Sequence, residues 1–193
     1  MKKILIAILI LFFASETFSQ VVSEDTRQKF GVSVAVFNDF WMEGPDGIDS
    51  RFVNLGSNVD FSYNHRLGKS PLFLSIGVGL GMHNYYSDGQ INDIKADTIT
   101  FSKIQQGYKK SKLSTTYLDV PFEFRFKSKG GFRMAVGFKA GYLIDSKIKY
   151  KGDRSVNDNT LVKVKSKGVK QIEAWRYGPT FRIGYRWINI WAY

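Results

Sequence analysis

Few side chains in this sequence could carry out chemistry. The chain has two histidines, His65 and His83, and no cysteine. A hydrolase or acyltransferase would need an imidazole beside a hydroxyl nucleophile and an acid, because the hydroxyl must be activated by a base. No motif brings such partners to either histidine, and His83 is more simply interpreted as an ordinary polar residue. We therefore expect a protein that is not an enzyme and binds no cofactor.

The acidic residues do not predict a metal site. Asp88, Asp93 and Asp97 fall in one polar segment at irregular spacing, whereas calcium sites gather several oxygen ligands around the ion. A solvated acidic loop is the simpler interpretation of this segment.

The charged residues that stand out are those that alternate with apolar ones. In YLDVPFEFRF (117–126), Asp119, Glu123 and Arg125 lie between leucine, valine and phenylalanine residues. Strict alternation over this length predicts a β-strand with two different faces. The apolar face could point into the core of a soluble β-sandwich or outward into lipid, with the charges lining the interior of a barrel.

The same period of two recurs along the chain. It predicts six full strands and the start of a seventh, at 30–36, 53–64, 72–86, 113–127, 132–142, 175–187 and 188–193. The connections alternate between long and short segments, at 42–51, 67–71, 87–111, 128–131 and 150–170. Short periplasmic turns and long external loops are typical of outer-membrane barrels, so the loop lengths favour the lipid-facing interpretation.

Glycines support the same interpretation. Many lie on the polar face, including Gly77, Gly79, Gly81, Gly137 and Gly141. Glycine weakens a solvated strand, but inside a narrow barrel it leaves room for large neighbours. In a small barrel the interior is filled by side chains, so we predict a hydrogen-bonded charge network that plugs the lumen: Asp60, Asp119, Glu123, Arg125, Arg133, Lys139, Arg182 and Arg186. The surplus of positive charges leaves a narrow anion path as an alternative.

Aromatic residues near strand ends are expected at the membrane interfaces. These are Tyr85, Tyr86, Trp175, Tyr177, Tyr185 and Trp187. Ordinary packing of aromatic residues in a core is the alternative.

The N-terminus predicts export. Lys2 and Lys3 precede an apolar run, and small residues precede Gln20, so residues 1–19 are expected to be a cleaved signal peptide. Residues 20–28 are expected to form a short periplasmic lead and 29–193 the barrel domain. No later segment has the roughly 20 apolar residues of a membrane-spanning helix.

The charge is strongly basic, at +11 for the whole chain and +10 without residues 1–19. Such a balance favours anionic partners, and for an exported protein lipopolysaccharide is a better candidate than nucleic acid. One external loop could contact anions through its basic residues: Lys149, Lys151, Arg154, Lys163, Lys165, Lys167 and Lys170. Solvated loops kept soluble by charge are the alternative.

The strands YLDVPFEFRF, GFRMAVGFKAGYLI and WRYGPTFRIGYRW together resemble the PorT-like outer-membrane β-barrel proteins over residues 30–193, most specifically in the Tyr-Leu-x-x-Pro piece at 117–121. The resemblance implies an all-β, antiparallel, up-and-down barrel of eight strands in a bacterial outer membrane, and it implies no catalytic residues. Because barrels close with an even number of strands, we expect that the C-terminal part is missing from this chain, or that the barrel closes differently.

These observations predict a small outer-membrane barrel with a plugged lumen and basic external loops. Its role would be structural or adhesive, or accessory to an envelope complex that includes other envelope proteins. A narrow porin-like channel or small-solute-binding barrel is one alternative, and a soluble periplasmic ligand-binding β-sandwich is another.

Overall fold

The computed structural model describes residues 24–193 except 43, 97 and 99. The expected signal peptide and residues 20–23 of the predicted lead lie outside the described residues. The described part contains one short helix and a series of strands: α2 (Glu24–Lys29), β1 (Phe30–Asn38), β2 (Leu55–Arg66), β3 (Leu72–Tyr86), β4 (Gly89–Ile91), β5 (Phe101–Lys103), β6 (Tyr108–Lys127), β7 (Phe132–Ser155), β8 (Asp158–Lys167), β9 (Trp175–Tyr185) and β10 (Ile188–Ala192).

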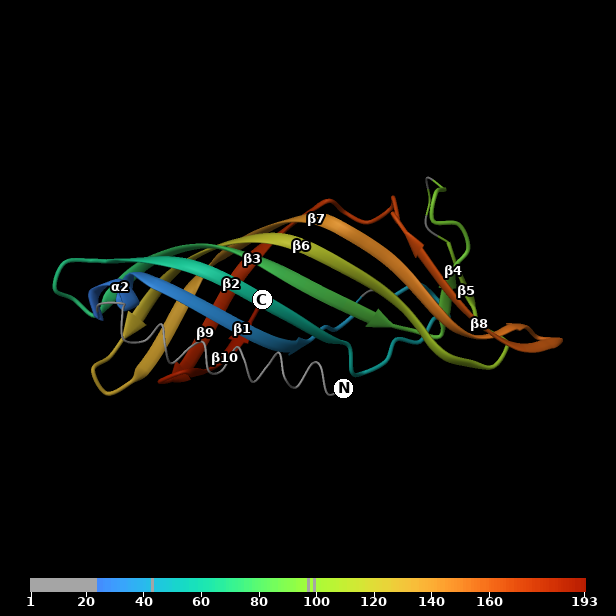
Figure 1. Ribbon diagram of the computed structural model, residues 1–193, viewed down its shortest axis with the longest axis horizontal. Coiled ribbons are helices and arrows are strands. Elements are labelled where there is room, and N and C mark those ends of the chain that lie inside the picture. The colour runs from blue at the N-terminus through green and yellow to red at the C-terminus, as the bar shows by residue number, and fades with distance from the viewer. Residues whose placement is uncertain (1–23, 43, 97, 99) are drawn as a thin grey trace.

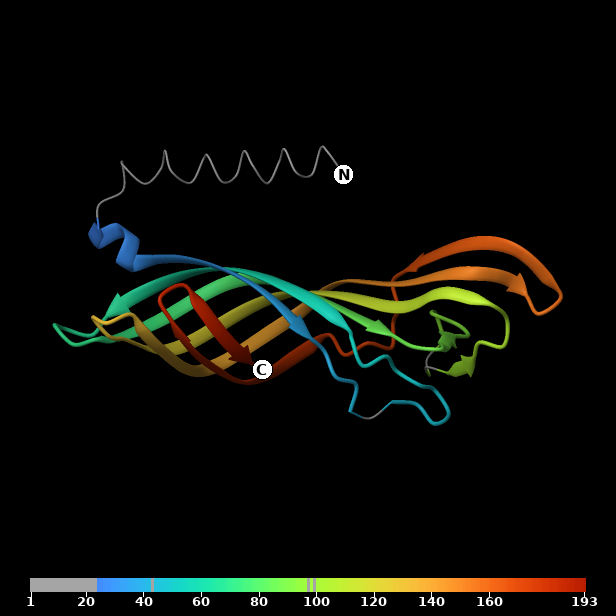
Figure 2. The same ribbon diagram turned by 90° about the horizontal axis from the view of Figure 1, so that it is seen from below.

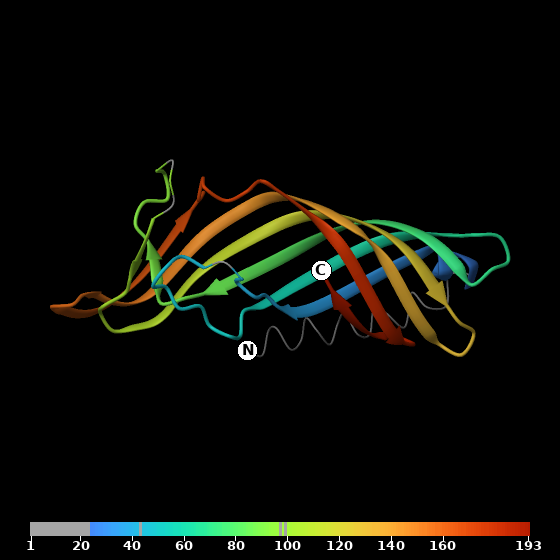
Figure 3. The ribbon, with the colours of Figure 1, turned by 180° about the vertical axis from the view of Figure 1, so that it is seen from behind.

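One antiparallel sheet dominates the fold (Figure 1). Its strands follow the order β1-β2-β3-β6-β7-β9-β10, so that each strand pairs with the next long strand of the chain, and β8 pairs with an extension of β7. The small β4–β5 hairpin forms a separate sheet. Seen from behind, the long strands curve as a tilted wall (Figure 3). The edges of this wall are β1 and β10, and no pairing joins them among the described residues.

The two ends of the sheet differ. Short turns and α2 lie at one end, and the long connections and the β7–β8 hairpin lie at the other (Figure 2). In the turn that joins β2 to β3, Gly68 has a φ of 62°, a left-handed conformation that glycine adopts without strain. The alternation of short and long connections predicted from the sequence is therefore present in the fold.

The predicted strands correspond to β1, β2, β3, β6, β7, β9 and β10, with two differences. Residues 24–28, expected to be an irregular lead, lie within the helix α2. The segment 150–170, expected to be a loop, instead forms the end of β7 and all of β8. This segment still alternates, in KIKYK and LVKVK, but lysines occupy the polar positions and obscure the strand pattern.

The sheet is apolar outside and polar inside. On β6, Val120, Phe122 and Phe124 are 41–48% exposed, whereas Asp119 and Glu123 are 0% and 2% exposed. Buried polar residues outnumber buried apolar ones among the described residues. This is the reverse of a soluble domain, in which apolar side chains fill the interior. In the described part of the chain, no helix is long and apolar enough to cross a bilayer.

Candidate functional site

Asp119 lies at the centre of the polar interior. Its neighbours across the sheet are Gly79 on β3 and Gly141 on β7. Because neither neighbour has a side chain, the Asp119 carboxylate can lie over Gly141, while the Asp60 carboxylate lies over Gly79. The carboxylate is fully buried, and a buried charge is stable only when it is paired and hydrogen-bonded.

Arg176 on β9 supplies that partner. Its Nη2 atom lies 2.8 Å and 2.7 Å from the two carboxylate oxygens of Asp119, and its Nε donates to Oδ1 over 3.3 Å. Charge-assisted hydrogen bonds of this kind are among the strongest in proteins. The guanidinium also lies 4.1 Å from the centre of the Tyr117 ring, a cation–π contact that further holds the side chain.

The network continues from Arg176 to His83 and Asp39. The Arg176 guanidinium contacts Nε2 of His83, and Nδ1 of His83 lies 2.9 Å and 3.0 Å from the carboxylate oxygens of Asp39. A guanidinium only donates hydrogen bonds, so Nε2 accepts, and the proton of a neutral His83 lies on Nδ1 and is donated to Asp39. Both ring nitrogens are therefore occupied, and neither is directed to a hydroxyl nucleophile.

Lys139 completes this cluster. Its ammonium is 2% exposed and lies 3.6 Å from an Asp119 oxygen. It also lies 3.6 Å from the centre of the Tyr193 ring and 4.6 Å from that of Trp191. The C-terminal residues of the chain therefore cover the ammonium with aromatic faces, which attract cations.

A second cluster surrounds Glu123, nearer the short-turn end. Arg125 donates from Nε to one Glu123 oxygen over 2.7 Å, and Arg182 donates to the other over 3.2 Å. The same guanidinium of Arg125 reaches β2, where it donates to Ser62 over 3.2 Å and to Asn64 over 2.8 Å. These contacts link β2, β6 and β9 across the interior.

The structure brings together five of the eight residues predicted for the charge network: Asp119, Glu123, Arg125, Lys139 and Arg182. Asp60 also faces the interior, where it accepts a 3.5 Å hydrogen bond from Ser33. Arg133 lines the interior toward the short turns together with Arg125 and Arg182, although it is exposed there. Arg186 departs from the prediction, because it lies beyond the end of β9 in a turn with a φ of 54°. The alternation of inward and outward side chains along a strand does not continue through a turn. Arg186 therefore does not point inward as Arg182 does.

Sequence reasoning missed Asp39, His83 and Arg176 as network members. Arg176 has the same strand parity as Arg182 and could have been included on that basis. Asp39 follows the end of β1 in an irregular segment, where no periodicity assigns it a direction. With these residues included, the network holds four carboxylates and four cations: Asp39, Asp60, Asp119, Glu123, Arg125, Lys139, Arg176 and Arg182. The charges of this set balance, but Lys127 and Arg133 also line the interior, so a positive surplus persists toward the short turns.

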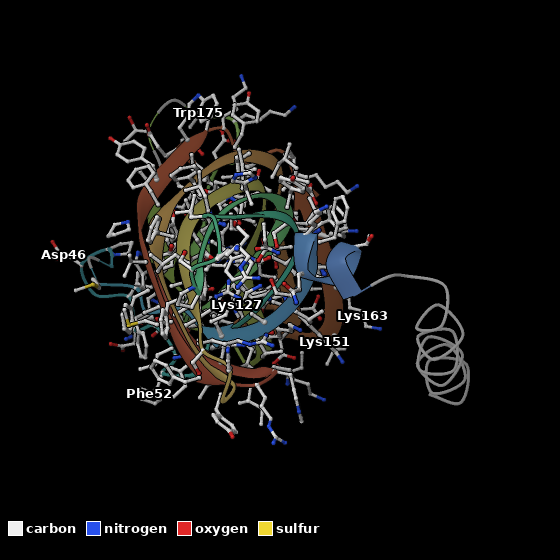
Figure 4. All side chains as sticks on the ribbon, turned by 90° about the vertical axis from the view of Figure 1, so that its left-hand side faces the viewer. Asp46, Phe52, Lys127, Lys151, Lys163 and Trp175 are labelled. Atoms are coloured by element: carbon white, nitrogen blue, oxygen red, sulfur yellow. The ribbon has the colours of Figure 1, made fainter. Side chains whose placement is uncertain are left out.

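The predicted interface aromatics lie near both ends of the sheet. Trp175 is 61% exposed and packs edge-to-face against Tyr142, with ring centres 4.9 Å apart, and it lies at the rim in a view along the long axis (Figure 4). Tyr177, Tyr185 and Trp187 are also exposed, at 74%, 55% and 81%. Tyr85 departs from the prediction. Tyr85 is in register with Leu113 and, two residues after His83 on the same strand, lies on the inner side of the sheet. Of Tyr85 and Tyr86, only Tyr86 therefore lies on the outer side.

The residues of the predicted anion-contacting loop separate into two groups. Five of them belong to the paired strands β7 and β8: Lys149, Lys151, Lys163, Lys165 and Lys167. Arg154 lies at the hairpin tip, 3.5 Å from Asp158, and Lys170 follows β8 in the connection to β9.

A cavity of about 970 Å³ lies between the two edges of the sheet, toward the short turns. Its walls include the edge residues Val34 and Trp191 and several basic side chains: Arg125, Lys127, Arg133 and Arg182. The described residues contain no group of three or more histidine, aspartate or glutamate side chains placed to hold a metal ion. Asp88 instead accepts a hydrogen bond from the Asp49 amide in the β1–β2 connection, and Asp93 accepts one from the Lys95 amide in its own loop. Asp97 lies outside the described residues.

An antiparallel up-and-down sheet with an apolar outer face and a charged interior defines a transmembrane β-barrel. Residues 13–192 match the family model of the outer membrane protein beta-barrel domain, and the chain belongs to that family. This assigns it to the outer membrane and replaces the alternative of a soluble sandwich. No curated protein matches the chain, and no solved structure matches it.

Proposed function

We propose that this protein is a small, non-enzymatic barrel with a lumen plugged by paired charges, serving a structural or adhesive role or assisting a larger envelope complex. The observation that carries this proposal is the Asp119–Arg176 pair, which joins β6 to β9 over Gly141 of β7 on the inner face and reaches His83 on β3. Opening a path through this ion pair would leave a buried carboxylate without its partner, and an unpaired charge in such a site is strongly unfavourable. The usual orientation of outer-membrane barrels would put the long connections outside the cell.

Planar-bilayer recording of the full-length protein tests the plug. We expect no stepwise conductance in concentrated potassium chloride, under conditions in which a general porin serves as the positive control. Folding is checked separately by the change in gel mobility on boiling. Well-resolved current steps from the folded protein would overturn the plugged lumen and favour the narrow channel.

A small-solute-binding barrel is the second candidate, because the cavity between the sheet edges is lined by basic side chains. Such a site would bind a small polycarboxylate or phosphate. Calorimetric titration of the folded protein with citrate and with inorganic phosphate tests this candidate. Saturable binding that is lost in an Arg133→Gln variant would support it, and the absence of binding would leave the plugged barrel as the better account.

Two finer assignments belong to the same proposal. The Tyr-Leu-x-x-Pro piece supports membership of the PorT-like group, and in this fold its Tyr117 stacks on Arg176 beside the central ion pair. Export through a cleaved signal peptide predicts a mature chain that begins at Gln20. The mass of the protein isolated from outer membranes tests the cleavage site, and retention of residues 1–19 would contradict it.

A further inference from the structure

Lysines face one another across the strands of the β7–β8 hairpin. The register pairs Lys147 with Lys167, Lys149 with Lys165, and Lys151 with Lys163, and β6 adds Lys110 directly opposite Lys151. Directly paired residues lie on the same side of a sheet. Lys112 also lies on this side, opposite Lys149, but it is buried and donates a hydrogen bond to Asn84. Apart from Lys112, this face of the extension carries seven ammonium groups, here called the lysine face: Lys110, Lys147, Lys149, Lys151, Lys163, Lys165 and Lys167.

The charges of the lysine face are largely uncompensated within the protein. Like charges directly opposite each other destabilise a sheet. Within the described part of the chain, the only ion pair that involves this face is Lys147 with Asp145, at 2.7 Å. Lys110 lies 5.4 Å from the centre of the Tyr86 ring, which offers a weaker cation–π contact. The arrangement therefore favours an external anion.

The opposite face of β6 and β7 is covered by the protein itself, whereas on β8 Val164, opposite Tyr150, is 51% exposed. Ser111 donates to the Gly89 carbonyl over 2.8 Å, and the Val169 amide donates to the Ser146 hydroxyl over 2.9 Å. Tyr150 is only 6% exposed on that face. Loops close the inward side, whereas Lys163, Lys165 and Lys167 on the lysine face are exposed.

A β-bulge directs the lysines outward. Opposite Thr116 and Tyr117, β7 carries one additional residue, Ile144, so that Leu143 pairs with Tyr117 and Asp145 with Thr116. Bulges re-aim the side chains that follow them. Before the bulge, the even-numbered residues of β7 face lipid. After it, the odd-numbered residues, including Lys147, Lys149 and Lys151, continue that outer face.

The lysine face therefore lies on the outer wall, beyond the membrane-facing aromatics. Lys147 lies five positions after Tyr142, or roughly 16 Å along an extended strand. Tyr142 and Trp175 pack together at the upper end of the apolar wall, where such rings mark the membrane interface. Figure 4 shows Lys151 and Lys163 beside each other at the periphery, away from Lys127 within the ring of strands.

We propose that the lysine face binds the phosphate groups of lipopolysaccharide in the outer leaflet. Cross-strand neighbours lie about 5 Å apart and next-but-one residues on a strand about 7 Å apart, so that one phosphate can contact two or three ammonium groups. Long lysine side chains can also extend along the wall while their charges reach the headgroups. This site does not depend on the plugged lumen, because a conducting barrel could carry the same face.

The test titrates folded, full-length protein in zwitterionic detergent with rough-type lipopolysaccharide and measures affinity by thermophoresis. A Lys149→Gln/Lys151→Gln/Lys165→Gln variant removes three charges from the lysine face. The control, Lys95→Gln/Lys109→Gln/Lys170→Gln, removes the same number of charges from the same end of the barrel but outside this face. The heat-modifiable gel mobility of each variant shows whether it has folded.

We expect the lysine-face variant to bind about a hundredfold more weakly, since three basic residues are removed and each contributes about fivefold near an anionic membrane surface. The control should change affinity less than twofold, and lipopolysaccharide stripped of phosphate should bind the parent protein no better than it binds the lysine-face variant. Equal weakening by both variants, or equal binding of the stripped lipid, would overturn the proposal. Tight binding of soluble dextran sulfate without binding of lipopolysaccharide would also overturn it, in favour of a soluble polyanion.

Discussion

Asp119 and Arg176 are joined by three hydrogen bonds across the interior of the sheet, although 57 residues separate them in the chain. The pair connects β6 to β9 without passing through the backbone pairing of β7, which lies between them. The pair lies over Gly141, which is in register with both residues, and its guanidinium also contacts Nε2 of His83.

Removing the charge of Asp119 should destabilise the protein. An Asp119→Asn variant leaves the buried cations Arg176 and Lys139 without their carboxylate, and breaking a buried pair in this way costs about 3–5 kcal/mol. Urea unfolding in lipid vesicles, followed by tryptophan fluorescence, measures the loss. Asp46→Asn is the matched control, because Asp46 is exposed and has no ion pair among the described residues.

A double-mutant cycle separates the pair from other effects. Asp119→Asn combined with Arg176→Gln should cost clearly less than the sum of the two single changes, since the second change removes a charge that the first left unpaired. Additive losses would show that the two side chains act independently.

The glycines beside the pair should not tolerate a side chain. A Cβ atom at Gly81 would lie 2.7 Å from Arg176 Nη2 and 2.7 Å from Asp119 Oδ2. Overpacking of this kind typically costs about 1–3 kcal/mol, so Gly81→Ala should lower the urea midpoint. Gly130→Ala in the β6–β7 turn is the control, because its nearest neighbour would be 3.9 Å away. Equal stability of the two variants would contradict the close packing around the ion pair.

The long connections that contain Asp49 and Asp88 should stay joined down to mildly acidic pH. Lys103 Nζ lies 3.0 Å from oxygens of both Asp49 and Asp88, and the Asp49 amide donates to Asp88 over 2.7 Å. Slight burial raises the pKa of the Asp88 carboxyl, but hydrogen bonds from Lys103 and the Asp49 amide outweigh it and hold the pKa below its ordinary value of 3.8. A depressed pKa gives stability that is present above the ordinary value and is lost as pH falls through the folded value.

Amide hydrogen exchange at Asp49 checks this linkage. After correction for intrinsic rates, protection should remain constant from neutral pH to about pH 5 and should fall below pH 4. At the alkaline end, hydrogen bonds to Asp49 and Asp88 raise the pKa of Lys103, so its contribution should persist until pH exceeds the ordinary lysine value. Protection lost between pH 7 and 5 would contradict the assignment to Asp88.

The wall of the barrel could be predicted from the sequence because apolar and polar residues alternate with the period of a strand. The contacts between interior side chains could not be predicted in this way. The alternation along β9 shows that Arg176 points inward, but it does not show which strand its side chain reaches. The bulge at Ile144 was also hidden, because one additional residue reverses the parity of everything that follows it. Tyr85 shows that position near a strand end does not predict the direction of a side chain. Its position suggested the membrane interface, but its register with Leu113 places it on the inner side of the sheet.

The apolar side chains of the outer wall face lipid, and we propose that the packed polar interior excludes water. Because the chain has no cysteine, single cysteines can be placed at will and spin-labelled in lipid vesicles. Val120, Phe122 and Val136 represent the outer face, and Ser75 and Thr180, both at most 5% exposed and away from the cavity between the sheet edges, represent the interior. Collision rates with oxygen, which concentrates in lipid, and with a water-soluble nickel complex are then measured at each site. We expect high oxygen access at the outer sites and low access of both reagents to the interior sites. Low access at the outer sites would place that face in a protein core, and high nickel access at the interior sites would reveal an open, water-filled lumen.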